Sequence, residues 1–231
     1  MISPQPNLPT HPHPHPHPPH ALFVHGMGRT PLSGWRMLSR LRAFDITTHT
    51  LGYIATLQSF ESIRQRLVAR IMTLSDQGDY ILIGHSLGGV LIRAAVAALP
   101  PEINPPRQIF LLGSPVQPSL YAMKLQRNWL FRLLTGDCGQ CLASPRRMAN
   151  IGVALVPTNS IVGVAGWRGW PSPFKGELND GIVSVSETQA DWIAEEIRLP
   201  MWHTYLPSKK QIADLILARI KLQPHVTTQP D

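Results

Sequence analysis

Five short, mostly apolar runs along the chain predict β-strands. They are "ALFVHG" (21–26), "FDITTHT" (44–50), "YILI" (80–83), "RQIFLLGSP" (107–115) and "NSIVGVAG" (159–166). Apolar runs of four to eight residues that are rich in β-branched side chains are typical of strands buried on both faces, as in parallel sheets. The pattern therefore favours a parallel sheet inside the protein.

Amphipathic segments between these strands predict helices. Residues 59–78 carry arginines on one face and apolar side chains on the other, the latter being Ile63, Leu67, Ile71 and Leu74. Residues 87–99 form a second predicted helix, directly after the strand at 80–83. A shorter helix follows the first strand, with Trp35, Leu38 and Leu41 expected on its apolar side.

The last predicted helix starts near Ser208. The order of Ser208 and Gln211 resembles a capping box, in which a serine and a glutamine satisfy the free N–H groups of a helix start. The apolar positions that follow are Ile212, Leu215, Ile216, Leu217 and Ile220. This helix closes the globular part of the chain.

Strands that alternate with helices predict an α/β fold. We expect a mostly parallel sheet of about six strands with helices on both faces, and functional residues at the carboxyl ends of the strands. Residues 21–222 form this single domain. One stretch departs from the alternation, because residues 116–150 are longer than an ordinary connection and mix apolar with basic side chains. This stretch is either an extended crossover or a cap over the site.

The two ends of the chain have different compositions from the domain. Residues 1–20 alternate histidine with proline, and proline fixes φ and removes backbone donors, so we expect a disordered, extended arm. Residues 223–231 are expected to form a flexible tail. Neither segment is needed for the predicted chemistry.

Composition narrows the function classes. A chain of 231 residues with 43% hydrophobic residues suits one domain with a sizeable core. The net charge of +7 reflects only 14 acidic residues against 21 scattered basic ones, which does not predict nucleic-acid binding. No apolar run has the roughly 18 to 20 residues of a membrane span, and no secretory signal peptide is recognised, so we expect a cytoplasmic protein. Cys138 and Cys141 form one C-x-x-C, either a redox or disulfide pair or two incidental thiols in a loop.

The segment "YILIGHSLGGVLI" (80–92) contains the candidate nucleophile Ser86. Gly84 and Gly88 flank Ser86 as G-x-S-x-G, between a predicted strand and a predicted helix. In that setting a serine occupies a strained turn that exposes its hydroxyl at the sheet edge, and the glycines permit close packing of strand and helix.

A nucleophilic serine needs a base and an acid that orients the base. In this fold the order along the chain is serine, acid, histidine. His203 precedes the last helix, whereas the other downstream histidine, His225, lies in the tail, so His203 is the expected base. Asp180 follows a strand in the turn Asn-Asp-Gly and is the expected acid. Its rivals are Glu177, Asp191 and Asp137, and the alternative role for Asp180 is to stabilise its own turn.

The oxyanion that forms during acyl transfer needs hydrogen-bond donors. We predict the backbone N–H groups of Leu87 and of Met27, which lies in the loop "HGMG" after the first strand. His25 in the same loop is expected to bond the loop backbone.

Five motifs together resemble the α/β-hydrolase superfamily, and within it small bacterial lipase- and esterase-type enzymes. They are "FVHGMG", "GHSLGG", "LLGSP", "NDGIVS" and "WHTYLPS". The resemblance implies ester hydrolysis by a serine triad without a cofactor or a metal ion, with Ser86, Asp180 and His203 as the triad. Gly26 and His85 belong to the matching motifs. The sheet is expected to be a minimal one, because strands that open larger members of the superfamily are absent.

Two alternatives to ester hydrolysis remain at this point. The same triad can transfer an acyl group to an alcohol or thiol, and a hydrolase fold can serve only for binding. The expected substrate is a small-molecule or lipid ester. Residues 119–134 are a candidate contact with a membrane surface, since apolar and basic side chains alternate there. Trp167 and Trp170 either line the substrate pocket or, as we expect, anchor their loop to the core. The oligomeric state is not predicted.

Overall fold

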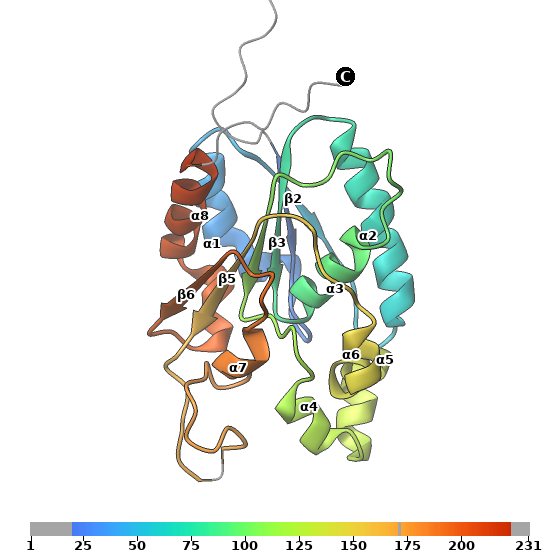
Figure 1. The fold of residues 1–231 in the computed structure, drawn as a ribbon, viewed down its shortest axis with the longest axis vertical. Helices are drawn as coiled ribbons and strands as arrows, with labels where there is room; N and C mark the ends of the chain where they lie inside the picture. Colours follow the sequence, from blue (N-terminus) through green and yellow to red (C-terminus); the bar gives the residue numbers. More distant parts are fainter. Residues whose placement is uncertain (1–19, 171, 223–231) are drawn as a thin grey trace, which may run out of the picture.

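The protein is built on one fully parallel β-sheet with helices on both faces (Figure 1). The computed structural model describes residues 20–170 and 172–222. The strands are β1 (His20–Val24), β2 (Thr47–Leu51), β3 (Tyr80–His85), β4 (Gln108–Leu112), β5 (Thr158–Gly163) and β6 (Glu195–Leu199), in the spatial order β2-β1-β3-β4-β5-β6. The predicted sheet of about six strands is confirmed. The predicted arm and tail lie outside the described residues, except for His20, which begins β1.

Eight helices and two 3₁₀ turns occur in the described part of the chain. They are η1 (Pro31–Gly34), α1 (Trp35–Arg42), α2 (Phe60–Ser75), α3 (Leu87–Val96), α4 (Leu120–Leu125), α5 (Trp129–Ala143), α6 (Pro145–Ala149), α7 (Val185–Thr188), η2 (His203–Ser208) and α8 (Lys210–Leu222). Alternate side chains of β1 point to opposite faces of the sheet. Ala21 and Phe23 belong to the core shared with α1 and α8, while Leu22 and Val24 belong to the core shared with α2 and α3.

Helix α2 follows its sequence pattern closely. The four apolar positions predicted to face the core are fully buried. The Ser59 side chain accepts a hydrogen bond from the Ser62 N–H and so caps the first turn, as expected for a serine at this position. The helix ends at Ser75, three residues before the predicted end.

The edge strand β6 has no counterpart among the five predicted strands. Its sequence is "EEIRL", and only Leu199 is buried. Charged residues are common on edge strands because they hinder pairing with another sheet. Because of the same charged residues, a search for apolar runs does not detect this strand.

Two local predictions were wrong. Trp35 was expected on the apolar side of its helix but is 55% exposed. Met37, which was not predicted there, is buried against the core beside Leu38. No capping box forms at Ser208, because this residue ends the 3₁₀ turn η2, and its hydroxyl donates to the Tyr205 carbonyl. Helix α8 therefore begins only at Lys210.

The long connection between β4 and β5 contains a crossover helix, and its role as a cap over the site stays a prediction. It contains α4, α5 and α6, and α5 is kinked at Gly136, where φ is +55°. The part of α5 after the kink packs in the core like a crossover helix and holds Cys138 and Cys141 as buried, unbridged thiols on a helix, not in a loop. The part before the kink projects with α4 beyond the carboxyl ends of the strands (Figure 1).

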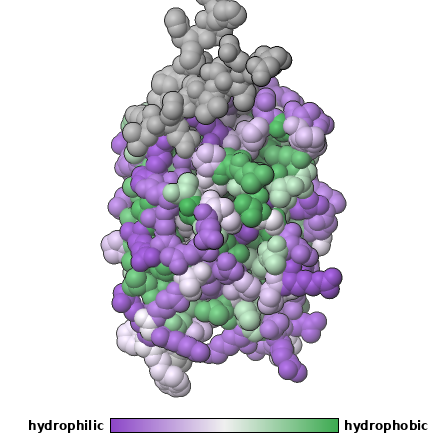
Figure 2. Space-filling model, in the orientation of Figure 1, coloured by the Kyte–Doolittle hydropathy of each residue, from purple (hydrophilic) through white to green (hydrophobic). Residues whose placement is uncertain are grey.

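None of the helices in the described ranges has both the length and the apolar character needed to cross a bilayer. Figure 2 shows that hydrophobic residues are interspersed with hydrophilic ones on the face of the molecule seen in Figure 1.

Candidate active site

Ser86 occupies a strained turn between β3 and α3. Its backbone angles are φ +52° and ψ −123°, outside the regions that residues with a side chain ordinarily adopt. The Ser86 N–H donates a 3.0 Å hydrogen bond to the Leu112 carbonyl at the end of β4. This is the geometry of a nucleophile elbow, in which the serine stands at the carboxyl edge of the sheet.

The two glycines beside Ser86 make this turn possible. A Cβ atom on Gly84 would collide with the backbone of Gly89, and one on Gly88 would collide with the Val24 carbonyl oxygen. Strand β3, helix α3 and strand β1 therefore approach one another at distances that only glycine permits. The spacing noticed in the sequence has a direct packing cause.

Asp180 and His203 form a buried hydrogen-bonded pair. The Asp180 Oδ2 lies 2.6 Å from the His203 Nδ1, and the two side chains are 0% and 9% exposed. Asp180 Oδ1 accepts from the N–H groups of Ile182 and Val183, at 3.0 and 2.7 Å. The turn-forming role of Asp180 and its contact with the histidine thus coexist, one on each carboxylate oxygen.

The pair fixes the protonation pattern of the imidazole ring. A carboxylate can only accept hydrogen bonds, so the proton of a neutral His203 is on Nδ1. This leaves the lone pair on Nε2, the form that a general base requires. The His203 N–H also donates to the Asp180 carbonyl at 2.8 Å, which holds the two backbones together.

The rival acids lie elsewhere. Glu177 accepts hydrogen bonds from Ser186, and Asp137 forms an ion pair with Arg147. Asp191 precedes β6 and so lies toward the amino edge of the sheet. None of the three contacts His203 in the described part of the chain, and His225 lies outside it.

The elbow and the acid–base pair meet at the end of β4. A Cβ atom on Gly113, the residue after β4, would approach Asp180 Oδ2 to 2.8 Å and His203 Nδ1 to 3.0 Å. No hydrogen bond among the described residues joins the Ser86 hydroxyl to His203. In structures without substrate such contacts are often long and shorten only when substrate binds.

His85, next to the serine, provides a second link between the elbow and the His203 loop. Its Nε2–H donates to the His203 carbonyl at 3.1 Å, and the two rings lie 4.7 Å apart. Burial lowers the pKa of His85 well below its ordinary value, and the nearby His203 adds to this effect. His85 is therefore neutral and holds the backbone of the expected base in place. The sequence had placed His85 only in a matching motif, because its partner is 118 residues away.

The loop after β1 is fixed by His25. The ring Nδ1–H donates to the Gly26 carbonyl at 2.8 Å, and Nε2 accepts from the Tyr53 N–H at 3.4 Å. Burial lowers the pKa of His25, so the ring stays neutral. With both ring nitrogens occupied by backbone groups, His25 supports the loop as expected and is not available as a base.

The two expected oxyanion donors are unoccupied. Leu87 is the first residue of α3, where an N–H group has no carbonyl partner within the helix. The hydrogen bonds of residues 20–170 and 172–222 involve neither this N–H nor that of Met27. Both groups therefore remain the expected oxyanion donors.

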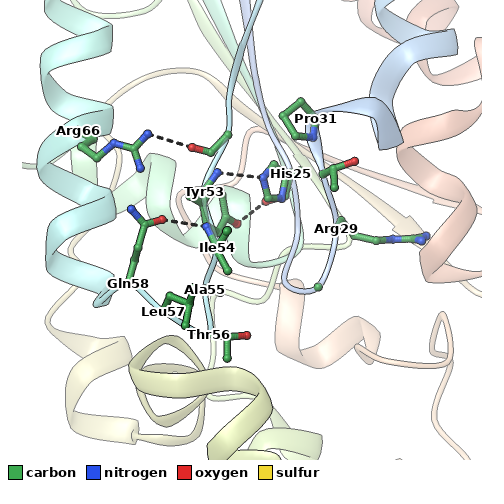
Figure 3. Close-up of a pocket in the computed structure, with 13 residues that line it drawn as sticks. His25, Arg29, Pro31, Tyr53, Ile54, Ala55, Thr56, Leu57, Gln58 and Arg66 are labelled. Atoms are coloured by element: carbon green, nitrogen blue, oxygen red, sulfur yellow. Dashed lines mark hydrogen bonds between the residues drawn. The ribbon is translucent and has the colours of Figure 1, made fainter.

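A cavity of about 800 Å³ adjoins this loop (Figure 3). It is lined by His25, Gly28, Arg29, Thr30, Pro31, Gly52, Tyr53, Ile54, Ala55, Thr56, Leu57, Gln58 and Arg66. The hydrogen bonds Tyr53–His25, Gln58–Ile54 and Arg66–Gly52 brace the segment after β2 that forms one wall. Arg29 points away from this segment and donates to the Thr204 carbonyl, beside His203. No motif marked the residues after β2 as part of a site.

The residues brought together here are those that a serine nucleophile requires. Among the described residues no cluster of three or more histidine, cysteine or acidic side chains is arranged to hold a metal ion. The arrangement can activate a serine and stabilise an oxyanion with backbone N–H groups.

Comparisons with solved structures show that the fold is shared. The mature lipase BlEst2 of Bacillus licheniformis shares the fold, with a TM-score of 0.70 at 16% identity over 91% of this chain and 94% of the lipase. RedJ, a thioesterase of the prodiginine pathway in Streptomyces coelicolor, has a TM-score of 0.55 at 16% identity over 95% and 96% of the two chains. Phospholipase PlaB of Legionella pneumophila has a TM-score of 0.58 at 16% identity, with 73% of this chain matching 45% of the phospholipase.

The sequence comparisons identify the family directly. No curated protein matched this sequence significantly. A sequence model of the alpha/beta hydrolase family, in contrast, matches residues 21–220, which is most of the chain. The parallel sheet and the serine turn are those expected of that family, and this protein belongs to the alpha/beta hydrolase family.

Proposed function

We propose that this protein is a serine hydrolase that cleaves carboxylic esters, with Ser86 as nucleophile, His203 as base and Asp180 as the acid that orients the base. The observation that carries the proposal is the buried hydrogen bond between Asp180 and His203, at the same sheet edge as the strained turn of Ser86. Burying a carboxylate and straining the serine backbone both cost folding free energy. The arrangement that results, a carboxylate that fixes the tautomer of a histidine, is the one that acyl transfer requires.

The reaction proceeds in two halves. Ser86 Oγ attacks the ester carbonyl carbon and its proton passes to His203 Nε2, while the Met27 and Leu87 N–H groups stabilise the oxyanion. The intermediate collapses, the carbon–oxygen bond to the alcohol breaks, and His203 returns its proton to the leaving alcohol. Water then attacks the acyl-serine with the same base, which releases the acid and restores the serine.

The cavity beside the oxyanion loop favours esters with a large apolar part. Pro31, Ile54, Ala55 and Leu57 contribute apolar surface, and the lining contains no acidic side chain. A volume of about 800 Å³ is within the range that accommodates a ligand of several hundred daltons. We therefore expect esters with longer acyl chains to be better substrates than acetyl esters.

The test is labelling with a fluorophosphonate probe, which reacts with activated serines without requiring the natural substrate. Wild type, Ser86→Ala and a control, Ser33→Ala, are labelled, and the modified peptide is located by mass spectrometry. Ser33 follows the cavity-lining residues Thr30 and Pro31 in the chain, and its hydroxyl donates to the Thr30 carbonyl. We expect wild type and Ser33→Ala to be labelled at Ser86 and the Ser86→Ala variant to remain unlabelled.

Hydrolysis of p-nitrophenyl esters, from acetyl to dodecanoyl, completes the test. Activity should disappear in Ser86→Ala and persist in Ser33→Ala. A folded wild-type protein that neither reacts with the probe nor hydrolyses any ester of the series would overturn the proposal.

A further inference from the structure

Three segments at the carboxyl edge of the sheet form one exposed surface, which we call the rim. It comprises residues 54–57 and 119–134 together with the described residues 167–170 and 172–175. Thr56 donates a hydrogen bond to the Leu134 carbonyl, and the rings of Tyr121 and Phe174 meet edge to face at 5.3 Å. The three segments are therefore joined, although they follow three different strands.

The rim exposes large apolar side chains. The most exposed are Leu57, Trp129, Leu133, Trp167 and Trp170, and Trp170 is 93% exposed. Trp167 and Trp170 thus do not anchor their loop to the core, contrary to the sequence-based expectation. Buried Phe174 has that role. In α5, Trp129, Leu130, Leu133 and Leu134 lie on one face of the helix, and this face has no partner in the described part of the chain.

The charges on the rim all have one sign. Lys124, Arg127, Arg132, Arg168 and Lys175 are exposed, and the three segments contain no acidic residue. None of these five cations forms an ion pair among the described residues. Since the whole chain has 14 acidic residues, a surface of this extent without any of them is strongly positive compared with the rest of the protein.

We propose that the rim docks on a lipid bilayer that contains anionic lipids. Tryptophan prefers the boundary between hydrocarbon and water, because its ring is apolar and its N–H needs a polar partner. Basic side chains beside such residues attract the phosphates of anionic lipids, while leucines enter the acyl region. A protein partner would need a surface of matching shape that is both acidic and apolar. An anionic bilayer has negative headgroups and apolar acyl chains everywhere on its surface.

The cavity adjoins the docked surface. Ile54 and Leu57 belong both to the rim and to the cavity wall, and Gly28 of the loop after β1 lines the same cavity. An amphiphilic molecule that leaves the bilayer therefore meets apolar surface beside that loop. Docking itself does not require Ser86. It remains testable even if the proposed ester hydrolysis is wrong.

The experiment is co-sedimentation of the Ser86→Ala protein with vesicles of phosphatidylcholine alone or of phosphatidylcholine with phosphatidylglycerol, at low and high salt. We expect binding to the anionic vesicles that weakens as salt rises. In this background, the double substitution Trp129→Ser with Leu133→Ser should weaken binding about tenfold or more. Replacement of Lys124, Arg127 and Arg132 by Gln should weaken it about 100-fold at low salt.

Leu155→Ser is the matched control. Leu155 is 94% exposed, but it precedes β5 and so lies toward the opposite edge of the sheet. It should bind like the parent protein. Thermal unfolding of every variant checks that it remains folded.

Three results would overturn the proposal. The first is an absence of binding to anionic vesicles at low salt, and the second is equal weakening by Leu155→Ser and by the rim substitutions. The third is a dimer, seen by sedimentation velocity, that the rim substitutions dissociate, which would assign the rim to a second copy of this chain.

Discussion

The floor of the site and its rim are built on opposite principles. The floor comprises Ser86, His85, Asp180 and His203. The last three are buried and hydrogen-bonded to one another or to neighbouring backbone, and Ser86 is held by its strained turn. The rim, built from the connections after β2, β4 and β5 at the same edge of the sheet, exposes tryptophan and leucine and fixes few of its side chains. Reaction geometry requires groups held to a fraction of an ångström, whereas contact with a fluid surface requires only area and charge.

This difference predicts where substitutions will act. A change at the floor should alter the chemistry or the folding stability, because His85, Asp180 and His203 each have a partner that would lose its contact. A change at the rim should leave both almost intact and alter only association with a surface.

Asp180→Asn is expected to have the largest effect. Asp180 Oδ1 accepts two backbone N–H bonds, so an asparagine must point its carbonyl oxygen at them and its NH₂ group at His203. The His203 ring would then accept on Nδ1 and carry its proton on Nε2, where it cannot act as a base. We expect kcat for ester hydrolysis to fall by about 10³- to 10⁴-fold.

Glu177→Gln is the control for this prediction. Glu177 lies three residues earlier in the same loop and was a rival for the role of the acid. Its carboxylate contacts only Ser186 among the described residues. Its kcat should stay within a few-fold of wild type. An equal loss in both variants would show that the loop as a whole, not the tautomer of His203, determines activity.

The buried His85 predicts a smaller effect, on stability against pH. Its folded pKa is lowered from 6.5, so below that pH the unfolded chain binds a proton that the folded protein excludes. The free energy of unfolding must therefore fall as pH decreases below about 6.5, by up to about 1.4 kcal/mol per pH unit for this residue.

His85→Gln separates this contribution from those of other groups. Glutamine can still donate to the His203 carbonyl but does not titrate. Urea unfolding of both proteins from pH 7 to pH 5 should show a shallower loss of stability in the variant. If the free energy of unfolding fell equally with pH in both proteins, His85 would gain a proton in the folded protein. Water would then reach His85 more readily than its burial indicates.

The contrast between floor and rim also explains which features the sequence could predict. The elbow is local: an apolar run, a G-x-S-x-G and a helix pattern lie within 13 residues and need no distant partner. Asp180 and His203 were found from chain order and turn chemistry, although their contact spans 23 residues. Two features depend on how distant segments fold together: the contact of His85 with the His203 loop, and the cavity wall after β2. No local sequence pattern predicted either of them.

The rim is where sequence reasoning was least successful. A tryptophan in a loop is ordinarily a core anchor, since burial of its ring is strongly favourable. In the loop 167–175 that position belongs to Phe174, which is 3% exposed, and the tryptophans are left outside. The sequence alone does not show which aromatic residue is the core anchor, because Trp167, Trp170 and Phe174 lie in one short stretch.

The smallest expected effect tests this distinction directly. Trp170→Ser removes the most exposed side chain of the rim, and we expect the free energy of unfolding to change by no more than about 0.5 kcal/mol. Phe174→Ala in the same loop removes a buried ring and should cost about 3 kcal/mol. Urea unfolding measures both. A large loss in Trp170→Ser would mean that this tryptophan packs against the protein in solution, and the rim would then lose one of its membrane-facing residues.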